Sequence, residues 1–201
     1  VTTIGPSVHS GICTGDLDAD GDTDVVRSNI WFENRQSGQQ WVSHRMTEPW
    51  GDDAISWQDN ATQTRTADLN GDGRLDVVIA DGENRNARIG WLEAPSDPKM
   101  GRWITHLLPK NDTATRGAYH CLHVGDFNGD GTDDIGYRRG CYFALDLNGN
   151  GRWEGRAGGD ALYAFGRSDD TPLIGDWDGD GTDDIGYRRG SYFALDLNGN
   201  G

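Results

Sequence analysis

The chain has 201 residues, a length that suits one domain or two small ones. Hydrophobic residues make up only 34% of it and glycine fills 30 positions, which predicts many turns and a modest core. The formal charge of −15 argues against a nucleic-acid partner, because such binding needs a basic patch or stripe. The sequence has no apolar run of 18 residues and therefore predicts no transmembrane helix.

The first predicted elements are a strand over residues 1–5 and an acidic loop that begins at Asp16. The strand resembles the last strand of a later repeat unit, and we expect it to complete another blade. The loop reads DLDADGDTD, which places acids at positions 1, 3, 5 and 9 and a glycine at position 6. Aromatic strand candidates follow at residues 29–33 and 41–44.

This loop pattern indicates calcium. Ca²⁺ takes six to eight oxygen ligands, and acids at alternate positions can surround one ion. Glycine at position 6 permits the sharp turn that returns later oxygens to the metal, and position 7 can add its backbone carbonyl. The predicted ligands of this first loop are Asp16, Asp18, Asp20, the carbonyl of Asp22, and Asp24.

The second unit repeats this order at a shift of 52 residues. Strand candidates follow its loop at residues 88–93 and 103–106. The sequons that begin at Asn60 and Asn111 lie in polar stretches ahead of the next unit's first strand, and both asparagines are glycosylation candidates. The predicted ligands of the second loop are Asp68, Asn70, Asp72, the carbonyl of Arg74, and Asp76.

The C-terminal half contains two near-identical copies, residues 125–151 and 175–201, which differ at only three positions. The predicted ligands of the third loop are Asp126, Asn128, Asp130, the carbonyl of Thr132, and Asp134. Those of the fourth loop are Asp176, Asp178, Asp180, the carbonyl of Thr182, and Asp184.

Two further segments match the pattern less well. The fifth loop has two amides where the others have acids, so we expect lower affinity; its candidates are Asp146, Asn148, Asn150, the carbonyl of Arg152, and Glu154. The sixth, with Asp196, Asn198 and Asn200, stops at Gly201 before its last ligands. The sequence thus predicts four strong sites, a weaker fifth and an incomplete sixth.

An EF-hand is excluded, because that loop needs a bidentate glutamate at position 12 and flanking helices. Position 12 here is Arg27, Ile79, Tyr137 or Tyr187, within segments that favour strands. The three cysteines (Cys13, Cys121 and Cys141) allow at most one internal disulfide. Cys121 and Cys141 are expected on the first and third strands of one blade, which lie too far apart for the two to pair.

Four units of about 50 residues, each with three or four short strands, are typical of an all-β propeller-like array. We place the units at residues 6–50, 60–110, 116–168 and 169–201 of one propeller or propeller segment, with residues 1–5 completing another blade. That strand could close a small ring, complete a neighbouring subunit, or belong to a longer array.

The phrases GDLDADGDTDVV, ADLNGDGRLDVV and GDFNGDGTDDIG resemble the FG-GAP/VCBS repeats of integrin-alpha-type β-propellers. The resemblance implies calcium in the hairpin loop between the first two strands of each blade, and a secreted or cell-surface setting. The chain departs from the family in blade number, since integrin-type propellers are seven-bladed and only four units are present here.

The sequence thus predicts a non-enzymatic, extracellular calcium-binding module for adhesion, recognition or self-assembly into a surface filament, with carbohydrate or a surface protein as a further possible partner. The alternative is the propeller part of a polysaccharide-active enzyme such as a lyase, because members of the resembled family occur beside such enzymes. Distinctive residues that recur from unit to unit, including His44 and His106, favour the first prediction.

Overall fold

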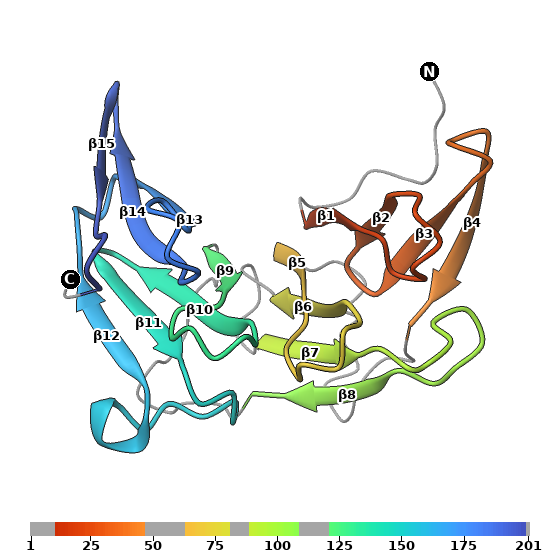
Figure 1. Cartoon of the computed structure of the whole chain (residues 1–201), viewed down its shortest axis with the longest axis horizontal. Helices are drawn as coiled ribbons and strands as arrows, with labels where there is room; N and C mark the ends of the chain where they lie inside the picture. Colours follow the sequence, from red (N-terminus) through yellow and green to blue (C-terminus); the bar gives the residue numbers. More distant parts are fainter. Residues whose placement is uncertain (1–10, 47–62, 81–88, 109–120, 200–201) are drawn as a thin grey trace. The chain divides into compact units, whose positions relative to one another are not determined.

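The computed structural model describes residues 11–46, 63–80, 89–108 and 121–199. The predicted strand at residues 1–5 and the sequons at Asn60 and Asn111 lie outside the described residues. The described chain forms four antiparallel sheets, each a simple up-and-down meander (Figure 1). The predicted fold class, an all-β chain of four blades with three or four strands each, is confirmed.

The first two sheets have four strands each, in the order of the chain. The first contains β1 (Ile12–Gly15), β2 (Asp24–Arg27), β3 (Ile30–Arg35) and β4 (Gln40–Arg45). The second contains β5 (Gln63–Ala67), β6 (Asp76–Ala80), β7 (Ile89–Glu93) and β8 (Ile104–Leu107).

The other two sheets come from the near-identical copies. The third contains β9 (Leu122–Gly125), β10 (Asp134–Arg139), β11 (Tyr142–Asp146) and β12 (Ala161–Ala164), with the short 3₁₀ helix η2 (Arg156–Gly158) before its last strand. The fourth contains β13 (Thr171–Gly175), β14 (Asp184–Arg189) and β15 (Tyr192–Leu195).

The strands form where β-branched and aromatic residues cluster, as predicted, and each of the four main acidic loops joins the first two strands of its sheet. The glycine at loop position 6 has a positive φ in all four main loops, a conformation that costs glycine little. These glycines are Gly21 (91°), Gly73 (83°), Gly131 (86°) and Gly181 (92°). Because strands flank every loop, the exclusion of an EF-hand also agrees with the structure.

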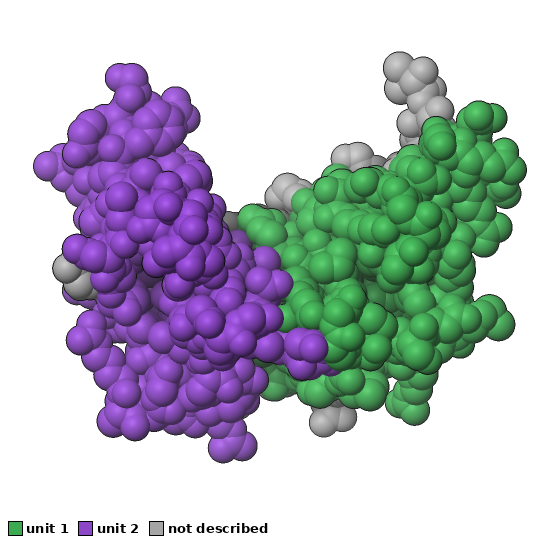
Figure 2. All heavy atoms as spheres, viewed as in Figure 1, with its two compact units in different colours: residues 1–68, 72–120 green, residues 69–71, 121–201 purple. Residues whose placement is uncertain are grey.

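The chain divides into two compact units, which Figure 2 shows in different colours. Unit 1 contains the first two sheets, and Trp31, Val77 and Leu92 lie fully buried in its core. The β1 and β5 strands are tied by side chains of β5, since the Thr64 and Thr66 hydroxyls donate to backbone carbonyls of the first sheet at 3.1 Å and 3.0 Å.

Unit 2 contains the third and fourth sheets, whose core includes Phe143, Leu145 and Ile185. Its two sheets meet where Asp183 of the fourth loop contacts the end of β9. The Asp183 carboxylate accepts a hydrogen bond from the backbone N–H of Asp126 (3.1 Å), and the Asp183 N–H donates to the Asp126 carbonyl (2.7 Å). A Cβ at Gly125 would lie 2.3 Å from Asp183 Oδ2, so glycine is required there for this close approach.

All three cysteines are free thiols, which agrees with the expectation that Cys121 and Cys141 do not pair. Cys141 was expected on a strand, but it lies in the turn between β10 and β11. Within the described ranges, no helix is both long and apolar enough to span a membrane.

Candidate metal centres

Each acidic loop is held in shape by its own carboxylates. The side chain at position 1 accepts hydrogen bonds from the backbone N–H groups at positions 5 and 6. In the first loop, Asp16 accepts from Asp20 (3.1 Å) and Gly21 (3.0 Å). The equivalent side chains that accept from the position-6 glycine are Asp68 (2.8 Å), Asp126 (2.9 Å) and Asp176 (3.1 Å). All four loops therefore share the same hydrogen-bonded conformation.

The carboxylate at position 9 fixes the other end of the loop. Asp24 is fully buried, accepts from the Leu17 N–H at 3.0 Å and accepts from the Asn34 N–H of β3 at 2.8 Å. In the third and fourth loops, Asp134 and Asp184 likewise accept a hydrogen bond from the backbone N–H at position 2, at 3.1 Å and 3.3 Å. Position 9 is the first residue of the second strand, and its side chain thus holds the start of the acidic loop against that strand.

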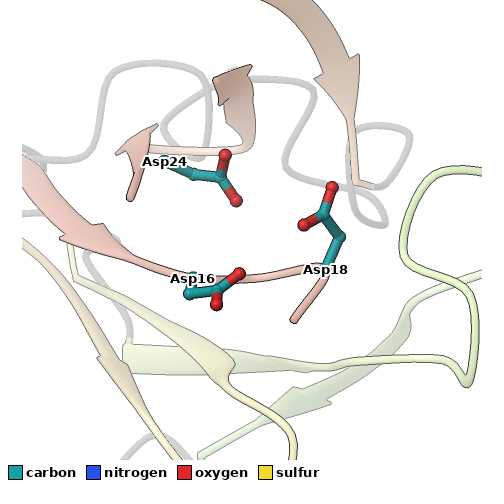
Figure 3. Close-up of side chains that lie close together, drawn as sticks. All are labelled: Asp16, Asp18 and Asp24. Atoms are coloured by element: carbon teal, nitrogen blue, oxygen red, sulfur yellow. The ribbon is translucent and has the colours of Figure 1, made fainter. Parts of the chain in front are cut away.

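The first and fourth loops bring three carboxylates together. Asp16, Asp18 and Asp24 each place a carboxylate oxygen within 4.8 Å of the others, and their side chains face a common space (Figure 3). Asp176, Asp178 and Asp184 form the same group in the fourth loop. The sequence spacing had predicted that each of these triads would share one ion.

The second and third loops differ at position 3, where Asn70 and Asn128 replace an acid. They form no group of three clustered acids among the described residues. Their position-7 side chains interact with position 5: Arg74 forms an ion pair with Asp72, and the Thr132 hydroxyl donates to Asp130. The Arg74 guanidinium offsets one negative charge, so the second loop is less acidic than its sequence pattern alone indicates.

The donor set of the first and fourth loops fits a hard cation. All candidate ligand atoms are oxygens, which Ca²⁺ prefers to nitrogen or sulfur. The described residues place no cationic side chain in an ion pair with Asp176, Asp178 or Asp184, so a divalent ion would relieve an uncompensated repulsion in the fourth loop. The sixth segment retains a buried Asp196, while its Asn200 lies outside the described residues.

A second acidic group in unit 1, formed by Asp18, Asp20 and Glu33, was not predicted. It already holds a cation, because the Lys99 ammonium lies 2.6 Å from Asp18 Oδ2 and 2.9 Å from Glu33 Oε1. Glu33 also forms a bidentate pair with Arg35 and contacts His44 Nε2 at 2.8 Å. This group is therefore an ion-pair network that ties the segment between β7 and β8 to the first loop.

The signal for part of this network was present in the sequence. Glu33 and His44 recur as Glu93 and His106, which lie 2.7 Å apart in the second sheet. In each sheet the histidine ring also stacks on a tryptophan of the neighbouring strand. A recurring Trp-x-Glu with a distant histidine thus indicates a shared structural pair, which agrees with the predicted structural role of His44 and His106. Lys99 has no such repeat signal.

Replacement of Lys99 by methionine is expected to tighten calcium binding at the first loop about tenfold, since a unit charge within roughly 5 Å of a divalent ion costs about 1.5 kcal/mol even in water. The measurement is a calorimetric calcium titration of the full chain. Arg102→Met is the matched control, because Arg102 is exposed and the variant loses the same charge. Equal affinities of the two variants would contradict the prediction.

Burial and mutual repulsion raise the pKa of several loop carboxyls. Burial, with a smaller contribution from Asp18 and Asp20, raises the pKa of Asp24 to about 6. Burial, with the neighbouring acids, raises the pKa of Asp134 to about 7. Without an added cation, these groups are therefore costly to ionise at neutral pH.

The stability of the metal-free chain should consequently fall with rising pH. A carboxyl whose folded pKa is raised stabilises the fold below its unfolded value near pH 4, and that contribution is lost as the pH rises through 6 to 7. A bound divalent cation removes the penalty. We expect the melting temperature in chelator to decrease from about pH 5 to about pH 8, and the calcium-induced increase to grow over the same range. A chelated protein that becomes more stable toward pH 8 would refute this expectation.

Four propeller-type blades with acidic loops between their first two strands define a class of acidic-loop β-propeller repeat proteins. Residues 68–137, which carry the second and third loops, match the model of the FG-GAP-like repeat family. The predicted resemblance to FG-GAP repeats is thereby confirmed for this segment.

A comparison with curated proteins found no match. Among solved structures, the chain resembles the Tc holotoxin pore of Photorhabdus luminescens (TccC3-D651A mutant) with a TM-score of 0.56 and 18% identity, covering 95% of this chain and 9% of that one. A weaker resemblance, with a TM-score of 0.36 and 18% identity, is to the V. cholerae biofilm matrix protein Bap1, covering 90% of this chain and 29% of that one. At this identity, the first match shows likeness of fold alone.

Proposed function

We propose that the chain is a non-enzymatic, extracellular repeat module in which calcium rigidifies the blade loops for adhesion, recognition or self-assembly. The observation that carries this proposal is the convergence of three carboxylates in the first loop (Figure 3) and of three in the fourth. Clustered carboxylates of this kind repel one another unless a cation lies between them.

Exposure of the loops supports an extracellular setting. Asp20, Asp176 and Asp180 are exposed, and no loop has the bidentate glutamate of an EF-hand. Calcium sites of extracellular modules have dissociation constants of roughly 10⁻⁴–10⁻³ M. Such sites would fill only where calcium is abundant.

The edge of the fourth sheet supports self-association as one of these roles. Among the described residues, β15 pairs only with β14, and its Phe193 and Leu195 are exposed. In the third sheet, the equivalent Phe143 and Leu145 are buried, and β12 pairs with β11. An open strand edge is a template for strand addition. We propose that a strand from a second copy, or from a neighbouring repeat, covers β15.

Calcium titration of the chelator-stripped chain tests the metal part of the proposal. The double variant Asp16→Asn/Asp24→Asn is expected to lose one bound ion, and Asp176→Asn/Asp184→Asn another. Asp169→Asn serves as the charge control, because Asp169 is exposed and lies outside the loops. Unchanged stoichiometry in both double variants would reject calcium binding at these loops.

Sedimentation analysis tests the assembly part. Deletion of residues 1–5 is expected to abolish any polymer if this predicted strand is the one that adds to β15. A chain that stays monomeric at every concentration, with or without calcium, would count against self-assembly while leaving adhesion and recognition open.

A further inference from the structure

The side chain of Asp160 has an unexplained buried oxygen. This residue is 3% exposed and directly precedes β12. Its Oδ2 accepts hydrogen bonds from the backbone N–H groups of Glu154 (2.5 Å) and Gly155 (3.2 Å). Its Oδ1 is buried and has no hydrogen-bond partner. A buried carboxyl oxygen without a hydrogen-bond partner is costly, so something outside the described contacts should satisfy it.

A second such oxygen belongs to Asp146, at the start of the fifth loop. Asp146 Oδ2 accepts from the Gly151 N–H at 2.8 Å, whereas its Oδ1 is buried and unpartnered. Burial, with the added charge of Asp160, raises the pKa of Asp146 to about 6. The two carboxylates are separated by 14 positions in the sequence, yet the charge of Asp160 reaches Asp146.

The segment between them folds like the four main loops. Position 1 accepts from position 6, the Asn148 side chain accepts from the Asn150 N–H at 3.0 Å, and the Asn150 side chain accepts from the Arg152 N–H at 2.7 Å. The Asn148 amide nitrogen donates to the Gly158 carbonyl at 2.8 Å, which fixes the orientation of its oxygen. Sequence reasoning identified this loop as weak because it has two amides, but Asp160 supplies an acid from beyond the pattern.

Protein cations do not balance these acids. Among the described residues, neither Asp146 nor Asp160 has an ion pair, although Arg156 lies in the same segment. The Arg156 guanidinium lies over the Tyr163 ring instead, 5.7 Å from its centroid. The charge of this group is therefore left for a ligand from solution.

We propose that Asp160 closes a separate divalent-cation site, in which Asp146 and Asp160 provide carboxylate oxygens and Asn148 and Asn150 provide amide oxygens. An all-oxygen donor set selects a hard ion such as Ca²⁺. The inference depends on the proposed function only for the choice of calcium as the ion. An ion here would join the end of β11 to the start of β12, because Asp146 ends the first of these strands and Asp160 precedes the second.

The test is a calcium titration of the full chain carrying Asp160→Asn, with Asp169→Asn as the charge-matched control. Asparagine retains an acceptor for the Glu154 and Gly155 N–H groups, so the loop should persist, and circular dichroism checks the fold. Asp160→Asn is expected to bind one ion fewer than the wild type and than Asp169→Asn. An equal number of ions would overturn the site.

Hydrogen exchange on the wild-type chain provides a test that needs no variant. Calcium is expected to slow amide exchange in residues 146–164, with protection lost in Asp160→Asn. Absence of calcium-dependent protection in this segment would contradict the site even if that variant failed to fold. If the double variants of the first and fourth loops kept the wild-type number of ions while Asp160→Asn lost one, the proposed loops would fail and this site would stand.

Discussion

Removal of calcium is expected to lower the melting temperature of the chain by roughly 10–20 °C. A ligand at 100 times its dissociation constant stabilises the folded state by about 2.7 kcal/mol per site. Each compact unit has roughly 100 residues and one triad of converging acids within a single loop, namely Asp16, Asp18 and Asp24 in unit 1 and Asp176, Asp178 and Asp184 in unit 2. In a domain of that size, 1 kcal/mol corresponds to a shift of about 4–8 °C. Scanning calorimetry in excess calcium and in chelator measures the difference.

The stabilisation by calcium can be tested separately in the two compact units. Asp176→Asn/Asp184→Asn should reduce the calcium response of unit 2 by the share of its fourth loop and leave that of unit 1, whose loop triad is Asp16, Asp18 and Asp24. Magnesium should stabilise less at equal concentration, since it demands a near-ideal octahedral site and releases its water reluctantly. A melting temperature that does not change when calcium is chelated would show that the loops are acidic turns without a bound ion.

Replacement of Phe143 by alanine is expected to destabilise unit 2 by about 3–5 kcal/mol, the usual cost of removing a buried phenylalanine. Phe193→Ala should change the free energy of unfolding by no more than about 0.5 kcal/mol, because surface substitutions have small effects. The two residues occupy the same position of near-identical repeats, but Phe143 is 1% exposed and Phe193 is 57% exposed. Urea unfolding monitored by circular dichroism compares the variants.

The variants Phe143→Ala and Phe193→Ala also test whether another strand covers the edge of β15. If a second copy covers that strand in solution, Phe193→Ala should also weaken association, and its cost should grow with protein concentration. A monomeric chain in which Phe193→Ala is as harmful as Phe143→Ala would show that the exposed face of β15 is covered from within the chain. Leu145 and Leu195, at 2% and 40% exposed, provide an independent pair for the same comparison.

Much of the candidate site could be predicted because a calcium loop is local. Nine consecutive residues set the positions of Asp16 and Asp24, and the glycine between them permits the turn that brings their carboxylates together. The strands could be predicted for a similar reason, since β-branched and aromatic runs alternate with glycine and aspartate clusters. Glu33 and His44 could have been paired from their repetition as Glu93 and His106.

Lys99 and Asp160 could not be predicted in the same way. Lys99 reaches Asp18 from a segment of the next sheet, and no spacing rule joins the two residues. Asp160 lies beyond the fifth loop and follows the 3₁₀ helix η2, so its role depends on where that helix returns the chain. The Lys99 contact arises from packing between segments that are distant in the sequence, whereas the Asp160 contact depends on the path of the chain through a short helix.

The acidic loops were thus determined by the sequence alone, since their ligand geometry depends on neighbouring residues and on one glycine turn. Only the tertiary structure decided which acidic side chains form ion pairs with cationic ones and which apolar side chains are buried. Residues 125–151 and 175–201 show the difference most directly, because they are nearly identical in sequence and yet Phe143 is buried while Phe193 is exposed. The physical reason is that the burial of a side chain depends on which strands pack beside its own. The β12 strand pairs with β11, and β15 has no described counterpart of β12.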